Sequence, residues 1–355
     1  MFKHCPKIVE HICLTNMMYK LKISIDSSYT FLAMVMLLTI TMYGDLRAQD
    51  SLKHEIKIKE AIDTLLLDWD KEHWSILALA NFKDNNFRVK NGTSTLKYAP
   101  KNRSGIGIGF ATSKLRIDLI LNIKTDKEER TDRFDAQGDI LLGNTLALFR
   151  LQKYDGFNVT NTDSNESEFR HDIGSLSIGL GGLRIMNPQL KPLNMIYSGV
   201  HTNYKTDGSL LLGAFAKYYS VRADSSIVPH SSRDLFNEQA QVLKSRQFAI
   251  GVNAGYSYFI DLKSNFFIFM TVAPGIGLSF KKVEAETETY VPDNLWDLSL
   301  YFRISVGYNQ KRYYIDVSVE NDYNYTYFDY GNNGIMNSTK AKLSVGWKFA
   351  RNKNK

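Results

Sequence analysis

The chain has 355 residues, of which 44% are hydrophobic and 23% charged, with a formal net charge of +7 at pH 7. Its mean hydropathy is -0.27. No stretch after residue 50 approaches the roughly 20 apolar residues that a transmembrane helix needs, so the mature chain is not a helical membrane protein. A membrane barrel would show no such stretch either, because only alternate strand residues face lipid. The basic residues are not clustered, and we expect no nucleic-acid partner.

The N-terminal region has the order of a secretory signal peptide. Lys20 and Lys22 precede an apolar run at residues 31–43 (FLAMVMLLTITMY), and the small residue Ala48 follows. We expect residues 1–48 to be a signal peptide cleaved after Ala48, which implies export through the Sec pathway. The residues before Met17 or Met18 are interpreted as an over-extended start. The alternative interpretation of the apolar run is a membrane anchor or a buried strand.

Both cysteines, Cys5 and Cys13, lie in this leader. The mature chain is therefore expected to have no disulfide, no thiol chemistry and no lipid-accepting cysteine. In residues 49–73, apolar side chains fall at roughly helical spacing among charges, which predicts a short periplasmic helical segment. The barrel is predicted over residues 74–349, followed by a polar tail at residues 350–355.

From Trp74 onward the apolar period changes to two. Strict alternation covers the segments 104–110, 115–124, 133–142, 247–260, 298–309 and 342–349. Strands of soluble sandwiches average about 5 to 6 residues, whereas tilted strands that span a membrane take about 9 to 11. One face of each segment is apolar, as a lipid-facing surface must be. We predict an all-β fold, a transmembrane up-and-down antiparallel β-barrel of about 12 to 14 strands in a Gram-negative outer membrane.

The connections are consistent with that architecture. Short turns are predicted at residues 143–144, 261–264 and 309–311, and long polar loops at residues 154–172, 222–245, 281–294 and 323–339. Short turns on one side and long loops on the other are the outer-membrane arrangement. Counting strands from the N-terminus and from the C-terminus places the connections around residues 187–246 on opposite sides of the barrel. One strand in this region is therefore missing from the prediction or surplus in it. Aromatic residues at predicted strand ends form a candidate interfacial girdle: Tyr256, Tyr258, Tyr308, Tyr313, Trp347 and Phe349.

Charged residues on the polar face of the predicted strands are the candidates for the barrel lumen. They are Arg116, Asp118, Arg133, Asp135, Asp139, Arg150, Arg303, Asp316 and Glu320. One interpretation is a paired polar network that fills the lumen. The sharper interpretation is a solute channel whose selectivity these charges set.

The run Gly105-Ile106-Gly107-Ile108-Gly109 has the glycine content of a nucleotide-binding loop but lacks its spacing and its following helix. The three glycines fall on one strand face, where they would let opposing strands or a plug approach closely. We therefore interpret them as structural.

No metal site and no cofactor is expected, because no histidine falls in a pattern such as H-E-x-x-H and the mature chain has no cysteine. A membrane-barrel hydrolase would need a serine, a histidine and an acid that meet near the rim. Two groups could supply such parts: His171 with Asp172 and Ser175, and His230 with Ser231 and Ser232. Solvated loop residues explain these groups equally well.

Several short segments, in order along the mature chain, resemble a family of outer-membrane barrels known as domain of unknown function 4421. They are residues 98–102 (YAPKN), 134–137 (FDAQ), 152–157 (QKYDGF), 205–210 (KTDGSL), 255–258 (GYSY) and 273–277 (APGIG). The turn at residues 187–192 (NPQLKP) departs from the family. The resemblance implies a barrel in the outer membrane and carries over no catalytic or binding residue.

The expected partners are outer-membrane lipid and the barrel-assembly machinery. The last predicted strand ends on the aromatic Phe349, which resembles the signal that this machinery reads, although a polar tail follows. The first functional hypothesis is a non-enzymatic barrel for passive transport or as a structural envelope component. One alternative is an outer-membrane enzyme acting on envelope lipid or peptide. The other is a soluble secreted barrel with its apolar face inward around a ligand.

Overall fold

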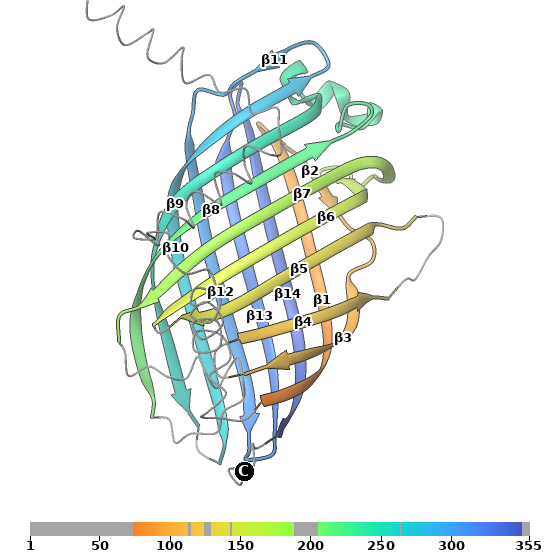
Figure 1. Cartoon of the computed structure of the whole chain (residues 1–355). Helices are drawn as coiled ribbons and strands as arrows, with labels where there is room; N and C mark the ends of the chain where they lie inside the picture. Colours follow the sequence, from red (N-terminus) through yellow and green to blue (C-terminus); the bar gives the residue numbers. More distant parts are fainter. Residues whose placement is uncertain are drawn as a thin grey trace, which may run out of the picture. The chain divides into compact units, whose positions relative to one another are not determined.

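The computed structural model describes residues 74–112, 115–123, 129–142, 144–187, 205–262 and 264–349. The predicted signal peptide (1–48), the predicted helical segment (49–73) and the predicted tail (350–355) lie outside the described residues. Antiparallel strands make up most of the described chain (Figure 1). No helix among the described residues is long and apolar enough to cross a membrane.

The strands follow one another in the order β1 (Trp74–Asn91), β2 (Ser94–Ala99), β3 (Ser104–Ala111), β4 (Leu115–Asn122), β5 (Asp132–Leu142), β6 (Thr145–Asn161), β7 (Ser167–Ile185), β8 (Asp207–Arg222), β9 (Val242–Asp261), β10 (Phe266–Ala285), β11 (Thr289–Tyr290), β12 (Trp296–Asn309), β13 (Tyr313–Tyr327) and β14 (Asn332–Phe349). Two short 3-10 helices, η2 (His230–Leu235) and η3 (Glu238–Ala240), lie between β8 and β9.

Twelve of these strands close into a ring. The order runs from β1 through β3 to β10, then β12, β13 and β14, and β14 pairs back onto β1. Each strand of the ring is antiparallel to its neighbours along the chain, so the predicted up-and-down barrel is confirmed. Closure matters in a membrane because lipid offers no hydrogen-bond partner to an open strand edge.

The outward face of the ring is an apolar belt. Leu119 is 66% exposed, Ile108 65% and Val252 59%, exposures that a lipid environment makes favourable and water does not. The next outward residues past the belt are polar: Asp84 follows Phe82 on β1, as Lys282 follows Phe280 on β10. The soluble alternative required the apolar face to point inward, and the structure places it outward.

Both ends of the ring's chain, Trp74 and Phe349, lie at one rim, which we call the turn end because most connections there are short. The Trp74 ring stacks on Phe349 with centroids 4.4 Å apart. Tyr308 lies 4.7 Å from Phe266 and 6.1 Å from Tyr313, centroid to centroid. Aromatic rings gathered at a rim are typical of a membrane interface.

The opposite rim, the loop end, shows where the sequence prediction was wrong. Residues 154–172 and 323–339 were predicted as long loops, but β6 runs to Asn161 before β7 starts at Ser167, and β13 runs to Tyr327 before β14 starts at Asn332. Beyond the belt the outward face no longer has to be apolar, and the inward face of β6 turns apolar with Phe157 and Val159 after a register shift, so the alternating pattern changes while the backbone ladder continues. The other two predicted loops are connections, at residues 223–241 and 286–295.

The region where strand sides disagreed, residues 187–246, holds one complete described strand, β8, which pairs on both sides. β7 and β8 are adjacent antiparallel strands, with Gly174 opposite Arg222 and Ile185 opposite Leu211. β9 then returns beside β8. Residues 188–204 lie outside the described residues.

The interior is layered. An apolar layer at the turn end consists of two clusters, one around Leu183, Phe259 and Phe269 and one around Leu77 and Tyr314. Another apolar layer at the loop end consists of strand residues together with residues of the 223–241 connection: Phe87, Leu96, Tyr98, Tyr154, Phe157, Val159, Ile173, Val221, Ile227, Val228, Phe236, Ala240, Val242 and Val283. Charged side chains lie between the two layers.

The wall is not uniform. β2 pairs with β1 on one side and β6 on the other at the loop end, so β3, β4 and β5 widen the ring only toward the turn end. β4 pairs with β5 at three positions, where residues 115–117 face residues 138–140. Above them, among the described residues, 118–122 of β4 pair with β3 alone and 132–137 of β5 with β6 alone. We call this gap in the ladder the wall split.

Candidate functional site

The charged residues predicted for the lumen lie on inward-facing strand positions. β4 carries Arg116 and Asp118, β5 carries Arg133, Asp135 and Asp139, β6 carries Arg150, β12 carries Arg303, and β13 carries Asp316 and Glu320. Most of them are brought into ionic clusters that span the barrel. Asp139 sits beside Arg116 and Leu148 in the strand register.

The first cluster joins β4 to β14. Arg116 donates from Nε to Asp118 at 2.9 Å and from Nη2 to the Ser344 hydroxyl at 3.0 Å. Lys342 donates to the other oxygen of Asp118 at 2.7 Å. One carboxylate therefore receives two cations, which is how a charge is held away from water.

The second cluster joins β1 to β5 and β6. Lys83 lies 2.5 Å from Asp135. The Tyr154 hydroxyl donates to the same carboxylate at 2.8 Å and accepts from Asn85 at 2.6 Å. Arg133 Nε lies 4.0 Å from Asp135.

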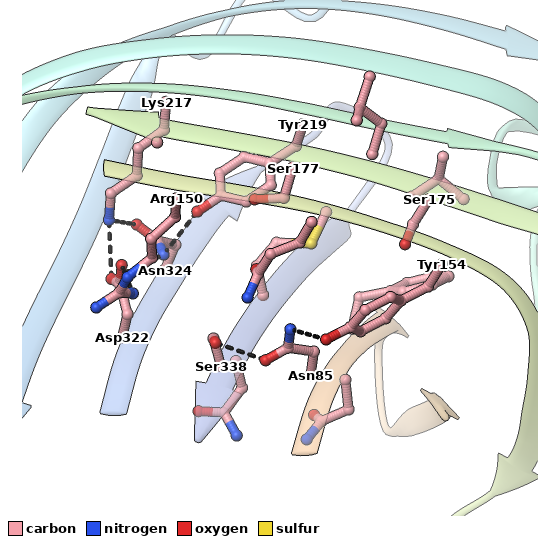
Figure 2. Close-up of a pocket in the computed structure, with 18 of the residues that line it drawn as sticks. Asn85, Arg150, Tyr154, Ser175, Ser177, Lys217, Tyr219, Asp322, Asn324 and Ser338 are labelled. Carbon is pink, nitrogen blue, oxygen red and sulfur yellow. Dashed lines mark hydrogen bonds and ion pairs between the residues drawn. The ribbon is translucent and has the colours of Figure 1, made fainter. Parts of the chain in front are cut away.

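The third cluster crosses the middle of the lumen, and we call it the central crossing. Its members are Arg150, Lys217, Glu320 and Asp322. Arg150 on β6 bonds both Glu320 and Asp322 on β13, the latter at 2.8 Å. Lys217 on β8 donates to Asp322 at 2.8 Å and to Asn324 at 2.7 Å. Figure 2 shows Arg150 and Lys217 converging on Asp322 from two strands.

A chamber lined by both polar and apolar residues lies on the loop-end side of the central crossing (Figure 2). Its cavity volume is about 70 Å³. Its polar lining includes Asn85, Tyr154, Ser175, Ser177, Tyr219, Asn324 and Ser338, and its apolar lining includes Phe87, Phe157, Val221 and Met336. The apolar residues Phe87, Phe157 and Val221 also belong to the loop-end layer, which covers the chamber.

A second cavity lies on the other side of the crossing, lined among others by Leu148, Leu183 and Tyr301. Both cavities are lined by Arg150, Lys217 and Asp322. The central crossing is therefore the partition between two cavities inside the barrel.

Sequence reasoning missed several members of these clusters. Lys217 and Lys83 lie on long strands whose alternation is interrupted by small or polar outward residues, and Asp322 lies directly before a predicted loop (323–339). Lys342 does lie on the polar face of a predicted strand, so the alternation of β14 was a usable signal for it.

The candidate hydrolase residues do not come together. Asp172 accepts two hydrogen bonds from Arg170, each at 2.7 Å, and the Arg170 guanidinium holds the pKa of that carboxyl below its usual range. The His171 ring packs edge-on against Phe169 at 4.6 Å, while Ser175 lines the chamber. His230 and Ser231 are exposed at η2, and Ser232 is buried against Asn161 at 3.1 Å. Among the described residues no group of three or more His, Cys, Asp or Glu side chains could hold a metal ion.

The β3 glycines face inward, under side chains from β1 and β4. A Cβ on Gly109 would lie 2.8 Å from Asp118 Oδ1 and 2.9 Å from Leu77 Cδ1. A Cβ on Gly107 would lie 2.1 Å from the Leu119 carbonyl oxygen. The absence of a side chain at these glycines lets the Asp118 carboxylate and the β4 backbone approach the β3 backbone closely.

Comparison with solved structures returns outer-membrane proteins. The outer membrane protease OmpT of Escherichia coli shares 9% identity over 78% of this chain and 97% of its own, with a TM-score of 0.36. The beta domain of the Bordetella autotransporter BrkA shares 13% identity over 76% and 98%, with a TM-score of 0.38. An outer membrane channel of Pseudomonas putida F1 shares 10% identity over 78% and 96%, with a TM-score of 0.29.

No curated protein matches the sequence. The profile of one family matches residues 61–349, which is the barrel with a short preceding segment. This match covers well over half of the chain and agrees with the resemblance carried by the short segments. The chain belongs to the family described as domain of unknown function DUF4421.

Proposed function

We propose that this protein is a sealed barrel of the outer membrane that serves as a structural component of the envelope. The observation that carries the proposal is the central crossing, in which Arg150 and Lys217 bridge the lumen to Glu320 and Asp322. An open pore needs a continuous water path along its axis. Here buried ion pairs occupy the middle of that path.

The apolar layers support the same proposal. Water and ions would have to pass the loop-end layer, the central crossing and the turn-end layer in turn. Opening all three would break apolar packing and separate buried charges, each of which is unfavourable. The predicted signal peptide provides for export through the Sec pathway, and the barrel-assembly machinery would insert the chain.

A second candidate function is gated passage of a small polar solute. The observation in its favour is that the central crossing separates two cavities, each lined by both polar and apolar residues, rather than a continuous core. Separation of Arg150 from Asp322 would connect these cavities. The two apolar layers would still have to move, so this candidate stands second.

Deletion of the gene tests the choice between the two functions. A structural role predicts leakage of periplasmic protein and sensitivity to detergent, both restored by the wild-type chain. Loss of uptake of a small polar solute, with leakage and detergent sensitivity unchanged, would favour gated passage and contradict the structural role.

A further inference from the structure

The wall split leaves two strand edges without ladder partners inside the apolar belt. Residues 118–122 of β4 and 132–137 of β5 face this gap, and their outward side chains Leu119, Leu121 and Phe134 are 66%, 78% and 58% exposed. Unpaired backbone at hydrocarbon depth is expensive unless something polar reaches it. Because the gap leaves backbone unpaired and cations lie beside it, we propose that the wall split binds the phosphate-bearing head of an anionic membrane lipid.

Arg133 provides a buried positive charge at the split. Its side chain is 1% exposed, and its Nη2 reaches from β5 to the Ser104 carbonyl oxygen at the start of β3, 3.4 Å away. Its Nε and Nη1 have no hydrogen-bond partner in the described structure. Among the described residues the carboxylate paired with it is Asp135, at 4.0 Å, and Lys83 already holds that carboxylate at 2.5 Å. A guanidinium in this position favours an additional anion, and its planar fork suits a phosphate.

A cleft adjoins the split where the belt ends. Its lining consists of Phe82, Pro100, Lys101, Asn102, Arg103, Ser104, Ile123 and Asn158. Among the described residues, Lys101 and Arg103 are the charged ones in its lining, and none of the lining residues is a carboxylate. Lys101 is paired outside the cleft with Glu129, and Arg103 lies 3.6 Å from Asp84. The cleft therefore presents cations to an occupant while their counter-charges lie beyond its lining.

The surroundings select a lipid rather than a soluble anion. Phe82 and Ile123 are 45% and 43% exposed and are the last apolar outward residues before the polar zone. Acyl chains attached to a phosphate at Lys101 and Arg133 would continue over Leu119, Leu121 and Phe134. A free phosphate would gain the ionic contacts but leave this apolar surface uncovered. The site thus combines cations for a phosphate head with an apolar surface for acyl chains, which is the combination that an amphiphile requires.

The test is retention of lipid by the purified full-length protein, measured by native mass spectrometry from detergent. The probes are phosphatidylglycerol and phosphatidylcholine with identical chains. We expect the anionic lipid to be retained about tenfold more than the zwitterionic one, as a charge-assisted hydrogen bond would give. Arg133→Gln should abolish the preference, and Lys101→Gln should reduce it several-fold. Inorganic phosphate in excess should not displace the lipid.

The matched control is Lys282→Gln, which removes the same charge just past the belt on β10, away from the split. It should keep the wild-type preference. Folding of each variant is checked by its heat-modifiable migration on gels, and the exposed Lys101 tests the site even if Arg133→Gln does not fold. Equal retention of the two lipids, a preference that survives Arg133→Gln and Lys101→Gln, or displacement by inorganic phosphate would each overturn the proposal.

Discussion

Lys217 on β8 and Asp322 on β13 meet across the lumen with a nitrogen–oxygen distance of 2.8 Å. Arg150 reaches the same carboxylate from β6, also at 2.8 Å. Two facing parts of the wall, β6–β8 and β13, are thus joined at one acid. Because buried ions must stay paired, this junction fixes the distance between the two walls, and in the proposed sealed barrel it closes the lumen.

Replacement of Arg150 by methionine should destabilise the barrel. Glu320 and Asp322 would be left buried with fewer cations, a loss of about 3–5 kcal/mol when a buried pair is broken. Urea unfolding in detergent micelles, followed by tryptophan fluorescence, measures the change. Lys153→Met is the control, because its pair with Asp155 is exposed on the outer surface and should change stability by about 0.5 kcal/mol or less. An equal effect of the two substitutions would contradict the central crossing.

Two glycines in the same part of the wall should respond oppositely to alanine. A Cβ at Gly107 would meet backbone of β4 at 2.1 and 2.8 Å, whereas a Cβ at Gly138 meets nothing within 4 Å. We expect Gly107→Ala to destabilise by about 1–3 kcal/mol. Gly138→Ala should be neutral or slightly stabilising, since it restricts the unfolded chain. Unfolding midpoints of the two variants measure this, and a tolerated Gly107→Ala would contradict the position of β4.

Within the belt, the sequence contained most of the information needed to predict the fold. Alternation along residues 115–123 and 298–309 identifies outward and inward faces because lipid accepts one and rejects the other. The same signal assigns Arg116, Asp118 and Glu320 to the interior. Past the belt this selection stops, so the loop-end extensions of β6 and β13 were predicted as loops.

The site itself depends on contacts that no local pattern encodes. Arg150 and Glu320 are 170 positions apart, and Lys342 and Asp118 are 224 apart. Which inward residue meets which depends on the strand stagger and on the wall split. The sequence therefore predicts a polar lumen, but it does not show whether the charges line an opening or bridge across it.

Acid should loosen the connection at residues 223–241. Arg170 holds Asp172 and also bonds the Ser226 carbonyl at 3.1 Å and the Ser225 hydroxyl at 2.8 Å, which pins this connection to β7. The folded-state pKa of Asp172 lies below its unfolded value of about 3.9. The stabilising contribution of the ionised Asp172 carboxylate is therefore present at neutral pH and is lost as the pH falls through its folded-state pKa.

Hydrogen exchange detects this change. Protection of residues 223–241 should fall in acid relative to β9, and Asp172→Asn should reproduce the loss at neutral pH. Unchanged protection of that connection in Asp172→Asn at pH 7 would show that other contacts hold it.

A charge on the outward face should be tolerated or not according to depth. Val252→Lys places an ammonium in the middle of the belt, where about 2–4 kcal/mol of destabilisation is expected. Asn333→Lys places the same charge outward at the loop end of β14, where about 0–1 kcal/mol is expected. Unfolding in lipid bilayers measures both. If Asn333→Lys destabilised the protein more than Val252→Lys, the belt would be wrongly placed.

The most direct test of the sealed lumen is planar-bilayer recording of the purified wild-type protein. We expect the current to stay at the level of the bare bilayer after insertion, because two apolar layers and the central crossing lie across the axis. Insertion itself is confirmed independently by protease protection of the same preparation. A steady, reproducible unitary conductance from the wild-type chain would contradict the account.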